Sequence, residues 1–154
     1  ALPICDPSKG LIAQTDSKTG KLVKLHDLDR CHPHSLQLVS ETRIFFGCSN
    51  GHGPSPKPGG DLAIFDIPEG KIVARGEGLG GNGGSDLHAA KARYYHSTTN
   101  ASLLVLNSTT GALIQKLPTW PGSRSVAVHH ATNRVFLATT AKDGPCGGCI
   151  VVYE

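Results

Sequence analysis

Short apolar segments alternate with turn residues along the chain, and helical spacing of apolar residues is nearly absent. Three stretches share one pattern, in which a strand leads through a tight turn into a second strand; they span 11–25, 62–75 and 103–117. An Asx residue opens each turn and a glycine closes it: Asp16 and Gly20, Asp66 and Gly70, and Asn107 and Gly111. Asx side chains accept bonds from nearby backbone amides, and glycine adopts positive φ readily. The pattern therefore predicts three β-hairpins.

A second set of segments recurs at one distance after each turn glycine. These segments begin at Arg43, Arg93 and Arg134, and an apolar stretch precedes each of them, at 34–39, 85–90 and 125–130. The two sets together predict a unit of four strands: an inner strand, a second, a third and, after the Asx–Gly hairpin, an outer strand. Because one arginine recurs in each unit, we expect it to pair with turn carbonyls or carboxylates.

A period of about 40–50 residues with four strands per unit is typical of β-propeller blades. The units run over approximately 11–61, 62–102 and 103–148, residues 149–154 begin a fourth, and residues 1–10 hold one further candidate strand. We therefore predict an all-β fold, a β-propeller of about three four-stranded blades plus one strand.

Such an arc is an incomplete ring, because closed propellers have roughly four to eight blades. Open blade faces and strand edges favour association. Two interpretations follow. Either the chain self-associates, most simply as two copies with about six blades in all, or a second chain or a longer propeller supplies the remaining blades.

The hairpin sequences TDSKTGKLVKL and LNSTTGALIQKL resemble the strand-Asp-x-x-Thr-Gly-Lys-Val-strand hairpin of the YVTN/NHL-like β-propellers. The resemblance extends over nearly the whole chain and implies propeller architecture. It implies no single activity, because this fold carries enzymes, lectin-like binders and scaffolds alike.

Composition narrows the classes of function. The formal net charge of +3 is too small and too dispersed to indicate nucleic-acid binding, and there is no apolar run of about 18 residues that would span a membrane. Two glycosylation sequons begin at Asn100 and Asn107, and the chain contains no Met and starts at Ala1. These features predict a processed glycoprotein that is secreted or periplasmic.

Five cysteines are present, so at least one is free or pairs with another chain. Cys31 precedes an inner strand and Cys48 ends a second strand, which makes the two a candidate disulfide on one face of a propeller. Cys146 and Cys149 form a CxxC motif in a glycine-rich loop. That motif has three interpretations: a tight disulfide, half of a zinc site, or a redox pair.

Polar side chains gather in the loops that enter inner strands and follow second strands, at the face where propellers bind ligands. His34, Asp86 and Arg124 occupy the predicted channel mouth and are the candidate catalytic residues, suited to a polar or anionic substrate. His32 and His34 are two residues apart, so on an extended strand they share a face. With His52 they are a candidate site for a divalent metal that polarises a carbonyl or activates water.

The candidate ligand-binding residues are His32, Asn50, His52 and Trp120, the last because a tryptophan in a channel-face loop can stack on a ligand. The alternative for all of these side chains is structural: they hydrogen-bond the loops or cover a blade edge.

Two hypotheses of function remain. The first is an exported, non-catalytic propeller module that binds a ligand or partner at the channel face as part of a larger ring or oligomer. The second is a propeller enzyme of the lactonase, lyase or isomerase type, with a polar and metal-assisted site at the channel mouth. Beyond that metal, no cofactor is predicted.

Overall fold

The computed structural model describes residues 2–6, 9–29, 31–49, 60–79, 83–98, 100–140 and 146–154. The chain divides into two compact units, 1–81 and 82–154, which are treated separately below. The described regular structure consists of fourteen strands and one 3-10 turn, η1 (Ala89–Lys91). Within those ranges, no helix is long and apolar enough to cross a bilayer. The prediction of an all-β fold is confirmed.

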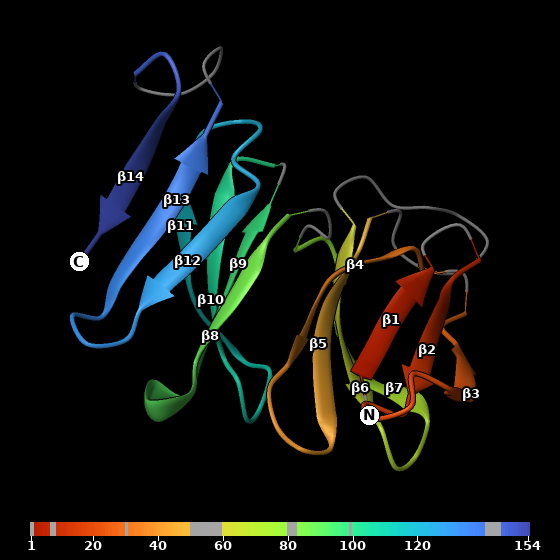
Figure 1. Cartoon of the computed structure of the whole chain (residues 1–154). Helices are drawn as coiled ribbons and strands as arrows, with labels where there is room; N and C mark the ends of the chain where they lie inside the picture. The colour runs from red at the N-terminus through yellow and green to blue at the C-terminus, as the bar shows by residue number, and fades with distance from the viewer. Residues whose placement is uncertain are drawn as a thin grey trace. The chain divides into compact units, whose positions relative to one another are not determined.

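The first unit contains two antiparallel sheets (Figure 1). One is ordered β1-β2-β3 and consists of β1 (Leu2–Asp6), β2 (Leu11–Thr15) and β3 (Leu22–Asp27). The other is ordered β4-β5-β6-β7 and consists of β4 (Pro33–Leu38), β5 (Arg43–Cys48), β6 (Asp61–Asp66) and β7 (Lys71–Gly76). Strand β1 is the further strand expected within residues 1–10.

The second unit also contains two antiparallel sheets. The four-stranded sheet consists of β8 (Ser85–His88), β9 (Arg93–Thr98), β10 (Ser102–Asn107) and β11 (Leu113–Pro118), in sequence order. The three-stranded sheet consists of β12 (Ser125–His129), β13 (Arg134–Thr139) and β14 (Cys149–Tyr153).

The predicted four-strand meander is present in full in the sheets β4–β7 and β8–β11. The sheets are bounded differently from the sequence repeats. A repeat counted from 11 to 61 starts at a third strand, whereas each four-stranded sheet starts at an inner strand. The other two sheets have three strands each in the described part of the chain.

The three Asx–Gly turns form as their residue types predict. Oδ1 of Asp16 accepts hydrogen bonds from the Lys18 and Thr19 amides, at 3.1 and 2.8 Å. Oδ1 of Asn107 accepts two in the same way, from Thr109 and Thr110, both at 2.9 Å. Each closing glycine has positive φ, between 68° and 77°, and donates its amide to the carbonyl of the opening Asx residue at 2.8 Å: Gly20, Gly70 and Gly111.

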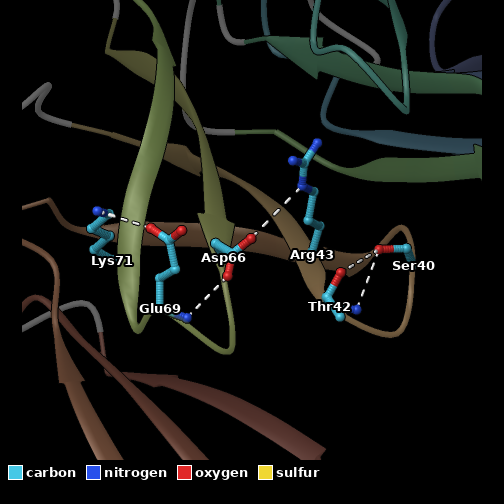
Figure 2. Close-up of polar contacts among 6 residues, drawn as sticks. All are labelled: Ser40, Thr42, Arg43, Asp66, Glu69 and Lys71. Atoms are coloured by element: carbon cyan, nitrogen blue, oxygen red, sulfur yellow. Dashed lines mark hydrogen bonds and ion pairs between the residues drawn. The ribbon is translucent and has the colours of Figure 1, made fainter.

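Each recurring arginine contacts a turn carbonyl or a carboxylate, as its recurrence predicts. Arg43 lies 3.9 Å from the Asp66 carboxylate, beside the turn in which Asp66 accepts the Glu69 amide (Figure 2). Arg93 donates to the Lys91 carbonyl at 3.1 Å, and Arg134 pairs with Glu154 at 2.6 Å. The arginine therefore has a structural contact in each repeat.

In each unit the two sheets pack face to face through apolar side chains. In the first unit, Ile12 and Leu28 pack with Ile44, Phe46 and Phe65 of the neighbouring sheet. In the second unit, Leu103 packs with Val128 and Val135, with Leu117 and Tyr153 at the margin. Alternate residues of each strand thus form one core between two successive sheets.

Candidate functional site

The predicted pairing of Cys31 with Cys48 is present, with the two Cα atoms 5.1 Å apart. Cys31 lies two residues before β4, and Cys48 ends β5 directly opposite Pro33. Both cysteines are fully buried. The disulfide therefore fixes the end of the sheet where β4 enters, which also carries His32 and His34.

His32 and His34 lie close enough to interact. Burial lowers the pKa of His34, and the neighbouring His32 lowers it further. No group of three or more metal-ligating side chains occurs among the described residues. His52 and Asn50 lie outside the described residues, so the three-histidine metal site stays a prediction.

Asp86 has a structural role, which is the alternative to catalysis that the sequence leaves open. Its Oδ1 accepts the amide of Leu87 at 2.8 Å, and its Oδ2 accepts the amide of Val128 at 2.7 Å. Leu87 follows it in β8, whereas Val128 belongs to β12 in the next sheet. The carboxylate therefore joins two sheets of the second unit through charge-assisted hydrogen bonds.

Replacing Asp86 by Ala is expected to lower the stability of the second unit by about 2 kcal/mol, because the buried Val128 amide loses its acceptor. Urea unfolding followed by the fluorescence of Trp120, the single tryptophan, measures the loss. Asp86→Asn keeps one oxygen acceptor and should lose less. If both variants unfold like the wild type, the carboxylate does not hold the sheets together.

Arg124 and Trp120 both lie in the connection between β11 and β12 of the second unit. The Arg124 carbonyl accepts the Gly84 amide, and its side chain is exposed. Trp120 is half-buried, and its carbonyl accepts the Ser123 amide at 3.2 Å. The proposed catalytic group of His34, Asp86 and Arg124 spans both units and stays a prediction.

Cys146 and Cys149 are paired, with Cα atoms 5.9 Å apart, which favours the tight disulfide among the three interpretations of the CxxC motif. Asn100 is exposed at the turn between β9 and β10, whereas Asn107 uses its side-chain oxygen within its own turn. Their glycosylation stays a prediction.

The sequence interpretation also missed a cavity between the two sheets of the first unit. Its volume is about 250 Å³. Its lining is mainly apolar, with Gln14, His26 and Glu41 as the polar members: Ile12, Gln14, His26, Leu38, Glu41, Ile44, Phe65 and Ile67. Ile12, Ile44 and Phe65 belong to the core, while Leu38 and Glu41 are exposed.

His26 is buried at the wall of this cavity. Its Nε2 lies 3.2 Å from Oε1 of Gln14, and its ring stands edge-on to Phe65 with the ring centres 5.0 Å apart. Its Nδ1 lies beside the backbone of Gly70 but makes no hydrogen bond of regular geometry among the described residues. A buried polar atom in this state costs about 1–3 kcal/mol of stability.

The environment of His26 keeps its ring neutral. Burial lowers the pKa of His26 below 6.5, the charge of Lys24 lowers it further, and only the Gly70 backbone acts in the opposite direction. The unfolded chain therefore takes up a proton at a higher pH than the folded chain does. Stability should be complete above about pH 6.5 and should decline as the pH falls from there towards the lower folded-state pKa.

This pH dependence is testable by thermal unfolding between pH 7.5 and 5. His26→Leu removes the titrating group, so its melting temperature should fall less on acidification than that of the wild type. Part of the slope should persist, because the pKa of His34 is lowered in the same direction. Identical slopes in the two proteins would contradict the assignment.

The second unit has an equivalent cavity of about 300 Å³ between its two sheets. The strand registers align five lining positions, the first unit's residue being given first: Ile12 with Leu103, Gln14 with Val105, His26 with Leu117, Ile44 with Val135, and Phe65 with Tyr153. The polar pair Gln14 and His26 thus replaces the apolar pair Val105 and Leu117. That difference within aligned repeats is the sequence signal that could have revealed His26.

The sheet β12–β14 carries an exposed apolar face. Ile150 is 64% exposed and Val152 is 45% exposed. Ile150 lies four residues before Glu154, and Ile12 and Leu103 lie four residues before the Asx residues that open their hairpin turns. The three positions are therefore equivalent in the repeat. Ile12 is 1% exposed and Leu103 is 0% exposed. At this position the sheets β1–β3 and β8–β11 bury their apolar side chain in a core, and β12–β14 does not.

No family model matches the chain, and no curated protein matches it. Among solved structures, the chain is similar in fold to the crystal structure of the computationally designed Ika4 protein, with a TM-score of 0.66 and 16% sequence identity. The similarity covers 95% of this chain and 80% of that one. At this level of identity the likeness concerns the fold alone.

Proposed function

We propose that the chain is a non-catalytic propeller module that assembles with a second copy of itself through the exposed face of β12–β14. The four sheets are blades in this proposal, and the assembly brings together the channel face predicted to bind a ligand. The observation that carries it is the exposure of Ile150, with Val152 beside it on the same face, at a position where the equivalent Ile12 and Leu103 are buried in a core.

A second copy suits this face because the sheet β1–β3 offers a complementary one. Within the first unit, Ala63 and Phe65 of β6 pack into the core against the sheet that precedes theirs. Their counterparts in β2, Ala13 and Thr15, are only half-buried. The face of β12–β14 can therefore receive the face of β1–β3 from another copy, in a head-to-tail contact of the kind that closes rings.

The energy available at such a contact is substantial. Complete burial of Ile150 and Val152 would contribute about 1.5–3 kcal/mol for each side chain. Head-to-tail contacts repeat, so every added copy would bury the same pair again.

The non-catalytic interpretation is favoured over the enzyme by the state of Asp86. Both of its carboxylate oxygens accept backbone amides, at 2.8 and 2.7 Å. These two bonds give Asp86 a structural role between β8 and β12, which accounts for the residue without catalysis. The paired cysteines agree with export, because disulfides persist in oxidising compartments.

Native mass spectrometry with light scattering tests the proposal. A mass of two or more chains that falls to one chain on mild denaturation is expected. A folded, lone monomer at every concentration up to about 1 mM would overturn it, because that limit corresponds to a binding free energy of only about 4 kcal/mol.

A further inference from the structure

We propose that the cavity between β1–β3 and β4–β7 binds a small, neutral and mostly apolar molecule that carries one hydroxyl group, through His26 and Gln14. This site is separate from the assembly face and from the predicted channel face. It lies wholly within the first unit, and its eight lining residues come from β2, β3 and the strands and turns of the neighbouring sheet.

The polar pair is not needed for packing the two sheets. The second unit has a cavity at the equivalent place and carries Val105 and Leu117 at these two positions, while its polar lining residues, such as Arg93 and Asn133, stand at other positions. There the apolar pair leaves no buried ring nitrogen. In the first unit, the buried His26 bonds Gln14 through one nitrogen and leaves Nδ1 without a hydrogen bond of regular geometry among the described residues. The buried nitrogen of His26 weakens the fold, and the equivalent position of the second unit carries leucine instead. A costly polar group that the repeat does not require indicates a role in binding.

The lining defines the chemical class of the ligand. Ile12, Ile44 and Phe65 offer apolar contact to its body. A hydroxyl group both donates and accepts, so it suits the His26–Gln14 pair in either tautomer of the ring. Glu41 is the one charged side chain of the lining, and it is exposed. The pKa of His26 is lowered, so its ring is neutral. A buried ionic group on the ligand would therefore lack a partner of opposite charge.

The size of the cavity fits a single aromatic ring. Cavities of about 150 Å³ with apolar walls bind benzene, and this one measures about 250 Å³. Phenol and toluene are therefore suitable probes, because they match in size and differ in the hydroxyl group.

The experiment titrates the full chain with phenol and, separately, with toluene, and follows backbone amides by NMR. Both probes should shift amides of 11–15 and 22–27. The measured quantity is the ratio of the phenol Kd to the toluene Kd. His26→Leu installs the residue type of the equivalent position 117, so it should fold, keep toluene binding and raise this ratio about tenfold through loss of the hydrogen bond.

Gln14→Val is the second variant, and it installs the residue type of position 105. It should raise the ratio in the same direction, and it carries the test if His26→Leu does not fold. Amides of 103–117 report the equivalent cavity of the second unit as an internal control. The proposal is overturned if neither probe shifts the first unit's amides, or if the folded variants leave the ratio unchanged.

Discussion

Ile150→Glu is expected to separate the assembly into single chains while leaving each chain folded. Ile150 is 64% exposed in the isolated chain, so a carboxylate there costs little before association. In the proposed contact the same carboxylate would be taken out of water without a partner, which is strongly unfavourable. The dissociation constant should rise by at least about a hundredfold. Analytical ultracentrifugation over a range of concentrations measures it.

The matched control for this variant is Ile114→Glu. Ile114 is an isoleucine of the same unit and is 46% exposed, but it lies on the outer strand β11. Its counterparts on β3 and β7, Val23 and Val73, are exposed as well, at 59% and 42%. Exposure is therefore the ordinary state of that position. Loss of assembly in both variants would indicate a general effect of charge and would count against the β12–β14 face.

Loss of the Cys31–Cys48 disulfide should produce the largest change in stability. The bond closes a loop over a sequence separation of 17 residues, and chain-entropy estimates for loops of this size are about 3 kcal/mol. The two sulfurs are also buried in the core of the first unit. The double variant Cys31→Ser with Cys48→Ser should therefore unfold at a clearly lower temperature. Circular dichroism of the strand signal follows the transition.

The control for this second prediction is the pair Cys146 and Cys149. It closes a loop over a separation of only 3 residues, for which the same estimate is about 2 kcal/mol. Both cysteines of this pair lie outside the described core, so removing them should cost less. If the two double variants lose equal stability, loop length and burial do not govern the contribution of the disulfides.

Local chemistry made much of this fold predictable from sequence. A turn that is opened by Asx and closed by glycine satisfies its own backbone groups within five residues, so the hairpins at Asp16, Asp66 and Asn107 are readable without tertiary information. The recurring arginines and the pairing of Cys31 with Cys48 followed from the repeats, because equivalent strand ends lie at equivalent places.

The candidate site was less predictable, because it depends on which side chains meet between sheets. The sequence leaves Asp86 open between a catalytic and a structural role, because its partner Val128 lies 42 residues further along the chain. The outer-strand position of His26 gives no sign of a site in the sequence, because its burial against Phe65 requires both sheets.

By itself, the sequence determined the strands, the turn types and the order of strands within a sheet, since these rest on contacts between neighbours along the chain. Only the tertiary structure decided which face of each sheet is covered. That is why Ile12 and Ile150, residues of one type at one repeat position, differ between 1% and 64% exposure. The physical reason is that burial belongs to the pair of sheets that pack together and not to the strand that carries the residue.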